Sequence, residues 1–155
     1  MPHMNEKIDF TVEVFIVYER KVLLRKHDKL KFWLSVGGHI ELDEDPNQAA
    51  IREVKEEVGL DIELYNPLGG KLFTAPKYRE LIPPQFLNRH NITESHEHVT
   101  LTYFATTSTD KIQLSTTELT EGCRWFTEKE IDDPKYDVKE RIKVYAKSAL
   151  QKIRT

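Results

Sequence analysis

The segment from Gly37 to Leu60, GGHIELDEDPNQAAIREVKEEVGL, constrains the fold more than any other part of the chain. Asp45, Pro46 and Gln48 form a helix-start signal, because Asp can cap, Pro suits the first helical position and Gln can reach back to the cap. Gly59 is a typical C-terminal stop. The segment therefore predicts one helix that begins at Pro46 and ends just before Gly59.

This predicted helix has an apolar arc beside an acidic arc, if each residue turns the chain by about 100°. The apolar arc consists of Ala50, Ile51, Val54 and Val58. The adjoining acidic arc consists of Glu53, Glu56 and Glu57. We expect the apolar arc to face a sheet, so the carboxylates should lie at the border of the buried face instead of pointing fully into solvent.

The crowded carboxylates should destabilise the helix on their own. Glu53 and Glu57 form a like-charged i,i+4 pair that costs roughly 0.2–0.5 kcal/mol. The helix dipole disfavours negative charge in the last turns, and Arg52 relieves only part of the repulsion, through Glu56. A divalent cation would reverse the sign of this interaction. Ligation by carboxylate oxygens alone indicates Mg²⁺ or Mn²⁺, and not Zn²⁺.

The loop before the helix favours a ligand site over the alternative interpretation, a solvated glutamate-rich surface. Gly37 and Gly38 allow the backbone to approach a ligand closely. Further acidic residues then lead into the same helix: Glu41, Asp43, Glu44 and Asp45.

The rest of the chain predicts strands and helices interleaved in one domain over residues 1–155, with 1–6 as a flexible N-terminus. Strands are expected at 10–18, 21–26, 99–106 and 122–127, with a short apolar piece at 34–38. Residues 61–74 resemble extended chain, and 75–98 are the least regular part. An amphipathic helix is expected at 137–154, with a capping box of Asp137 and Glu140. We therefore expect an α/β (α+β) fold with a mixed sheet covered by helices on both faces.

The composition excludes several classes of protein. A net charge of −3 argues against binding to nucleic acid by bulk charge. The single cysteine, Cys123, excludes an internal disulfide framework and a cysteine-rich zinc module. No apolar run approaches the roughly 18 residues of a membrane span, and no secretory signal is visible. These features predict a cytoplasmic protein.

The run from Gly38 to Leu60 resembles the Nudix box, whose pattern is G, five residues, E, seven residues, R-E-U-x-E-E-x-G-U, with U a bulky aliphatic residue. Every fixed position is matched at the right spacing, by Gly38, Glu44, Arg52, Glu53, Val54, Glu56, Glu57, Gly59 and Leu60. The departure is Val36, where a proline commonly precedes the two glycines. Val36 could loosen that turn, but it removes no ligand.

The resemblance implies a Nudix-type α/β/α sandwich that hydrolyses a diphosphate linked to another group in a nucleotide derivative. The implied metal ligands are Glu53, Glu56 and Glu57, helped by the Gly37 carbonyl. The metal would be Mg²⁺, with Mn²⁺ as a possible substitute, and it would neutralise the diphosphate and lower the pKa of a bound water. The resemblance also implies a salt bridge between Arg52 and Glu44 that ties the loop to the helix.

The base that accepts the proton of the attacking water varies in this family. The candidates here are Glu53, Glu118 and Glu97. Glu118 and Glu97 have the alternative interpretation of exposed loop acids.

Candidate substrate-binding residues lie outside the box. Arg25 could contact phosphate, or it could be a surface charge at the end of a strand. The irregular segment 74–98 could be a recognition loop or a packed surface loop. Three residues of this segment could stack on a base or bind phosphate: Arg79, Phe86 and Arg89. Tyr103, on the strand that follows, could line the same cleft.

Three histidines, His90, His96 and His98, fall in and after this segment. His96 and His98 would share one side of a strand, so a zinc site is conceivable. No cysteine accompanies them, and a polar substrate loop explains them equally well.

Two other functions fit a chain with these features. A catalytically silent Nudix domain that senses a nucleotide is one alternative, although no box glutamate is missing. Isopentenyl diphosphate isomerase resembles this fold but relies on a catalytic cysteine, and Cys123 lies far from the box along the chain. We expect a small nucleotide-type substrate, no membrane partner and a possible homodimer.

Overall fold

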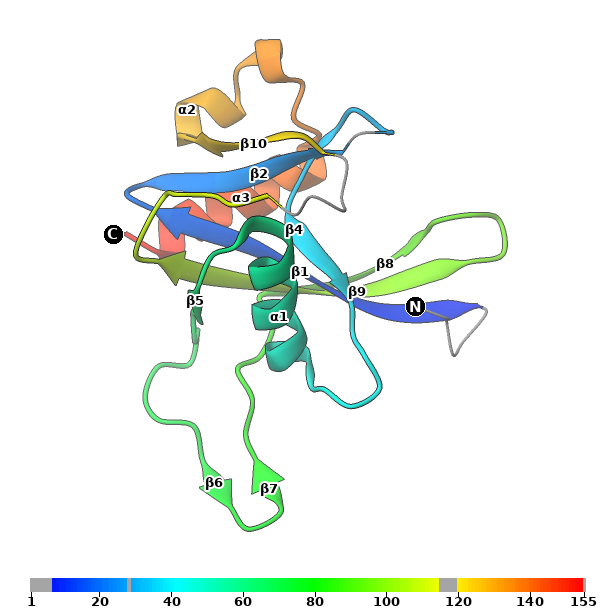
Figure 1. Cartoon of the computed structure of the whole chain (residues 1–155), viewed down its shortest axis with the longest axis vertical. Coiled ribbons are helices and arrows are strands. Elements are labelled where there is room, and N and C mark those ends of the chain that lie inside the picture. The colour runs from blue at the N-terminus through cyan, green and yellow to red at the C-terminus, as the bar shows by residue number, and fades with distance from the viewer. Residues whose placement is uncertain (1–6, 28, 115–119, 155) are drawn as a thin grey trace.

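A mixed β-sheet forms the centre of the computed structural model, which describes residues 7–27, 29–114 and 120–154 (Figure 1). The strands are β1 Ile8–Tyr18, β2 Lys21–His27, β3 Trp33–Leu34, β4 Val36–His39, β5 Ile62–Leu64, β6 Thr74–Ala75, β7 Tyr78–Arg79, β8 Phe86–Asn91, β9 Glu97–Thr107 and β10 Thr120–Phe126. The helices are α1 Pro46–Val58, α2 Glu128–Ile131 and α3 Glu140–Lys152, with a 3₁₀ turn at Pro134–Tyr136.

The main sheet has eight strands in the order β10-β2-β1-β9-β5, with β3 on β2, β4 on β1 and β8 on β9. The pairing of β1 with β9 is parallel, whereas the other strand pairs of this sheet, among the described residues, are antiparallel. Parallel register places Asp9 opposite His98 and Glu13 opposite Thr102. This pairing therefore joins polar side chains that lie about ninety residues apart in the chain.

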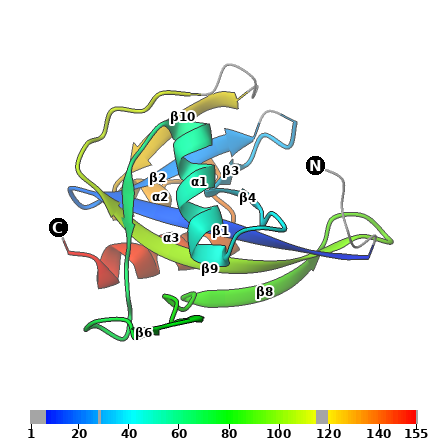
Figure 2. The same cartoon turned by 60° about the horizontal axis from the view of Figure 1, so that its bottom comes forward.

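Helices cover both faces of the sheet, which confirms the predicted α/β/α sandwich (Figures 1 and 2). Side chains alternate along β1, so Val12, Val14 and Ile16 pack in the core beneath α1. Phe15 and Val17 point the other way, into the core beneath α3. A charged residue of β1 with an odd residue number therefore has its side chain on the face of the sheet that α3 covers.

Helix α1 begins and ends where the sequence predicts. Asp45 accepts a hydrogen bond from the backbone N–H of Gln48, and the Gln48 side chain accepts one from Asp45, so the capping box is confirmed. Gly59 adopts the left-handed conformation with φ of 70° at the C-terminal cap. Most of the apolar arc is buried, but Ile51 is 45% exposed, so its predicted contact with the sheet is wrong.

The predicted cap of the last helix is also wrong. Helix α3 begins at Glu140, and its N-cap is Lys139, which makes no side-chain capping bond. Asp137 instead ends the preceding 3₁₀ turn in the left-handed conformation, with φ of 51°. The reason is local, because Asp133 caps that turn through the backbone N–H of Lys135 and delays the start of the helix.

Residues 75–98 are more regular than the sequence indicates. Strand β8 pairs with β9 along its whole length, from the Phe86–Thr102 pair to the Asn91–Glu97 pair. Its composition, FLNRHN, has few of the residues that favour strands, so the pairing with β9 decides its conformation. The preceding β6–β7 hairpin projects away from the sheet (Figure 1). Within the described ranges, no helix is long and apolar enough to span a membrane.

The C-terminal cap of α1 generates a prediction about stability. A Cβ at Gly59 would lie 2.9 Å from the Cβ of Gln113, whereas a Cβ at Gly69, which has φ of 66°, would meet no atom within 4 Å. Gly59→Ala and Gly69→Ala should each lower the free energy of unfolding by about 1–2 kcal/mol, because a residue with a Cβ is strained in the left-handed conformation. Gly59→Ala should cost more, because it adds a clash, and urea unfolding would measure the difference. Equal losses would show that the packing against Gln113 relaxes freely.

Candidate active site

Arg52 of α1 joins the loop before the helix to the acidic face of the helix. Its Nε and Nη2 donate to the Glu44 carboxylate at 2.9 and 2.6 Å, respectively. Its Nη1 donates to Glu53 and to Glu56, at 3.1 Å in each case. Its Nη2 also donates to the backbone oxygen of His39 at 3.0 Å. The expected Arg52–Glu44 ion pair is thus confirmed as one part of a larger network.

The Arg52–Glu44 pair is electrostatically stable at neutral pH. Hydrogen bonds from Arg52 lower the pKa of Glu44 below its ordinary value. The Glu44 hydrogen bond in turn raises the pKa of Arg52. The Glu44 side chain is only 11% exposed, so little water competes for its oxygens.

Glu57 lies deeper than the other two glutamates and faces an arginine from the sheet. Its side chain is 5% exposed, and its Oε2 lies 3.5 Å from Nε of Arg25 on β2. With Glu53 and Glu56 on Arg52, every carboxylate of the acidic arc has a guanidinium partner. Arg52 therefore relieves only part of the repulsion, as expected, and the sheet supplies a further partner, Arg25, for Glu57.

Two glycines allow β4 to approach its neighbours closely. A Cβ at Gly38 would lie 2.4 Å from Oε1 of Glu53, so the Glu53 carboxylate rests directly against this backbone. A Cβ at Gly37 would lie 2.1 Å from the backbone oxygen of Val12 on β1. Gly38 therefore makes room for a functional side chain, and Gly37 makes room for the sheet itself.

A cavity of about 210 Å³ lies beside β4, on the face of the sheet that bears Glu13. Its lining includes both glycines, Arg25 and five further polar side chains, which come from β1, β4, β8, β9 and α3: Glu13, His39, His90, His98 and Arg141. Arg25 and the two glycines thus connect this cavity with the glutamates of α1. A ligand that extends from the cavity past β4 would meet the acidic arc.

Glu13 joins the side chains of the cavity floor, and it is not among the site residues predicted from the sequence. The Glu13 carboxylate accepts hydrogen bonds from Ser35 at 2.9 Å and from Thr102 at 2.7 Å. Arg141 of α3 contacts both of its oxygens, at 3.3 and 3.4 Å. One signal was available: Glu13 is the single charge in the apolar run FTVEVFIVY, and a charge inside a buried strand needs partners.

Cys123 lies much nearer the site than its place in the chain indicates. Strand β10 pairs with β2, and Cys123 stands directly opposite Arg25. Distance along the chain was therefore a poor reason to discount a catalytic thiol. Burial raises the pKa of Cys123 to about 11, so it is a neutral thiol and a weak nucleophile at neutral pH.

Two of the predicted substrate-binding residues pack inside the protein. Phe86 stacks on Tyr145 of α3 with a centroid distance of 4.3 Å and joins the core beneath that helix. Tyr103 is 2% exposed in the core beneath α1, and burial raises its pKa to about 12. Neither residue lines the cavity.

The two predicted arginines lie on the surface, away from the cavity lining. Arg79 is exposed in the β6–β7 hairpin, and the chain that follows it is held to the first turn of α1, where Asn47 exchanges two hydrogen bonds with Ile82. Arg89 pairs with Glu97 at 2.5 and 2.8 Å, and this contact lowers the pKa of Glu97. The other candidate base, Glu118, falls outside the described residues. From segment 74–98, it is His90 and His98 that reach the cavity.

Comparison with known proteins gives one family. A family model described as the NUDIX domain matches residues 8–147. A solved structure of a NUDIX family hydrolase from Clostridium perfringens has 34% identity and a TM-score of 0.81, and the match covers 96% of this chain and 98% of that one. The structure of the E. coli dihydroneopterin triphosphate pyrophosphohydrolase has a TM-score of 0.67 over 95% of this chain and 98% of that one. At 18% identity it shows a shared fold alone.

Curated relatives match over shorter stretches. The dihydroneopterin triphosphate diphosphatase of Haemophilus influenzae is 42% identical over 82 residues, which are 51% of this chain and 50% of that protein. The protein of the same name from E. coli K12 is 48% identical over 44 residues, or 28% of this chain and 29% of that protein. The matched stretch thus spans half or less of the length of these relatives.

The Arg52–Glu44 pair predicts an acid-sensitive contribution to stability. Because the pKa of Glu44 is lowered, this contribution is complete above the ordinary glutamate pKa and is lost as the pH falls through the lower, folded-state pKa. Glu44→Gln should lower the free energy of unfolding at pH 7 by about 1–3 kcal/mol, since Arg52 loses its main partner. Denaturant titrations across pH should show the two proteins converging in acid. Glu41→Gln is the control, because Glu41 lies 4.0 Å from Arg52 and is more exposed.

Proposed function

Because this chain belongs to the NUDIX domain family, we propose that it is a hydrolase that cleaves the diphosphate linkage of a nucleotide derivative with the help of Mg²⁺ or Mn²⁺. The observation that carries this proposal is the Arg52 network, which gathers Glu44, Glu53 and Glu56 around one guanidinium. All the side chains of the box that could bind a metal or orient a ligand are present.

The donor chemistry of α1 suits a hard divalent cation. Glu53, Glu56 and Glu57 offer carboxylate oxygens only, and Gly37 would add a backbone carbonyl, so all the proposed ligands are of the type that Mg²⁺ prefers. Arg52 Nη1 contacts both Glu53 and Glu56, which keeps these two carboxylates side by side. A bound cation would neutralise the diphosphate and lower the pKa of the attacking water.

The chain itself would orient the substrate. The supporting observation is that Arg25 lines the cavity and lies beside Glu57, and in this proposal its guanidinium would donate hydrogen bonds to a phosphate oxygen. Water attack would form a new oxygen–phosphorus bond and break the bridging one, and the proton of the water must pass to a base. Among the described candidates Glu53 is favoured, because its carboxylate lies against Gly38 in the cavity wall, whereas Glu97 is held by Arg89 and does not line the cavity.

An assay over a panel of compounds would identify the group attached to the diphosphate. The panel should include nucleoside triphosphates, nucleotide sugars, ADP-ribose and dinucleoside polyphosphates. The names of the curated relatives add dihydroneopterin triphosphate. Product identification for each compound, with Mg²⁺ present, tests the proposal directly. Tight binding without turnover of any compound would instead indicate a nucleotide sensor.

We also propose a small-molecule partner and not a nucleic acid, in keeping with the net charge of −3. A homodimer and a cytoplasmic location remain part of this proposal. Light scattering on the purified chain would measure the first, and fractionation of cells would measure the second.

The acidic arc yields a prediction about activity and the metal. Glu53→Gln, Glu56→Gln and Glu57→Gln should each lower turnover by about 10²-fold or more, and excess chelator should abolish the activity of the wild type. Glu63→Gln, on β5, is a control that should keep full activity. Steady-state rates with the best substrate provide the measurement. Full turnover in chelator would contradict the proposal.

The same variants should differ in stability without metal. The Glu56 side chain is 60% exposed, so Glu56→Gln should change the free energy of unfolding by less than about 0.5 kcal/mol. Glu57→Gln should cost about 1–3 kcal/mol, because it removes the charged partner of Arg25 in a buried place. Thermal melts in chelator would separate the two cases.

The glycine pair yields a prediction that separates activity from folding. Gly38→Ala should displace the Glu53 carboxylate and lower turnover, while the free energy of unfolding changes little, because a side-chain end can move. Gly37→Ala should lower the free energy of unfolding strongly, because its Cβ meets the backbone of Val12. Paired kinetics and denaturant titrations would test this contrast. Wild-type turnover in Gly38→Ala would contradict the assigned place of Glu53.

A further inference from the structure

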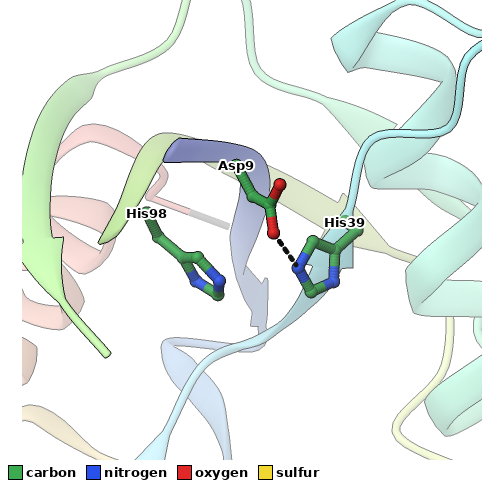
Figure 3. Close-up of side chains that lie close together, drawn as sticks. All are labelled: Asp9, His39 and His98. Carbon is green, nitrogen blue, oxygen red and sulfur yellow. Dashed lines mark ion pairs between the residues drawn. The ribbon is translucent and has the colours of Figure 1, made fainter. Parts of the chain in front are cut away.

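An aspartate and two histidines from three adjoining strands meet at the edge of the cavity. They are Asp9 of β1, His39 of β4 and His98 of β9, and their side chains point toward one another (Figure 3). One possible ligand atom from each residue lies within 4.8 Å of the other two. Within residues 7–27, 29–114 and 120–154, no other trio of histidine, cysteine or acidic side chains meets this criterion.

A third histidine reaches the same aspartate. Nε2 of His96 lies 3.0 Å from Oδ2 of Asp9, and Nε2 of His39 lies 3.6 Å from the same oxygen. The rings of His39 and His96 lie 5.0 and 5.2 Å from the ring of His98. The Asp9 side chain is 7% exposed, so its carboxylate sits among imidazoles with little water.

The backbone of the sheet, and not a loop, holds most of this cluster in place. Asp9 stands opposite His98 in the parallel pairing of β1 with β9. His39 stands opposite Thr11, which lies two residues from Asp9 and therefore on the same face of β1. Groups fixed on neighbouring strands need little reorganisation to bind a ligand together.

We propose that Asp9, His39, His96 and His98 form a second metal site, which takes a borderline transition-metal ion such as Zn²⁺. Imidazole nitrogens with one carboxylate oxygen are typical zinc ligands, and four of them complete a tetrahedral shell. The glutamates of α1 offer oxygen only, so the two sites differ in the class of cation that they favour.

A cation in the histidine cluster would also act on the candidate active site. The side chain of His39 belongs to the cluster, and its backbone oxygen accepts the hydrogen bond from Arg52 at 3.0 Å. A bound ion would therefore fasten the end of β4 to β1 and β9 and steady the position of that carbonyl. Because His39 and His98 also line the cavity, the ion would place positive charge at its edge.

The test is zinc binding by the full chain after treatment with chelator and dialysis. Calorimetric titration with Zn²⁺ should give one equivalent, and saturating Mg²⁺ should not displace it. His98→Asn and Asp9→Asn should each weaken zinc binding by about tenfold or more. His27→Asn is the matched control, since His27 lies on β2, outside the cluster, and this variant should bind zinc like the wild type. The Glu57→Gln variant should bind zinc as tightly as the wild type, because Glu57 lies outside the cluster. The zinc result is therefore independent of whether the proposed hydrolase activity is found.

A second measurement uses the wild type alone, in case a variant fails to fold. X-ray absorption at the zinc edge should show a shell of nitrogen and oxygen with several imidazole rings. Zinc should also raise the melting temperature of the wild type more than that of His98→Asn. The proposal is overturned if zinc does not bind, if both cluster variants bind it like the wild type, if His27→Asn loses it equally, or if the shell contains no imidazole.

Discussion

The guanidinium of Arg52 is the contact on which the arrangement of the candidate site depends. It holds Glu44 of the loop, Glu53 and Glu56 of the helix, and the backbone oxygen of His39 on β4. A planar group with several fixed donors can join partners from three segments in one plane, which a lysine cannot do. The loop, the helix and the strand therefore keep their relative positions through one side chain.

The parallel pairing of β1 with β9 builds the other half of the site. It joins Thr11 to Thr100 through a hydroxyl contact of 2.7 Å, and Glu13 to Thr102 at the same distance. These contacts form a polar floor within a largely apolar sheet, and α3 adds Arg141 to it. The register of the paired strands therefore decides which side chains line the cavity, whereas the helical periodicity of α1 decides which carboxylates form the acidic arc.

This difference explains how much could be predicted from the sequence. Helix α1, its caps and the Arg52–Glu44 pair depend on residues within about a dozen positions of one another, so a local pattern reveals them. Asp9, Glu13 and His39 acquire their partners through long-range pairing, which no local pattern encodes. For the same reason Tyr103 and Phe86, which were expected at a ligand, lie in the two cores. Alternation showed which residues of β9 share a face, but not which face the cavity occupies.

The arginine partners of the acidic arc lower the net free energy that a cation would gain by binding there. A cation that binds there would exchange with Arg25 and Arg52, so its net affinity would be the difference between two sets of ion pairs. Such an exchange weakens the hold on the ion, but in its absence the two arginines already offset part of the repulsion among the carboxylates. The helix can therefore form before any metal arrives, and the supply of metal would control when the protein works instead of whether it folds.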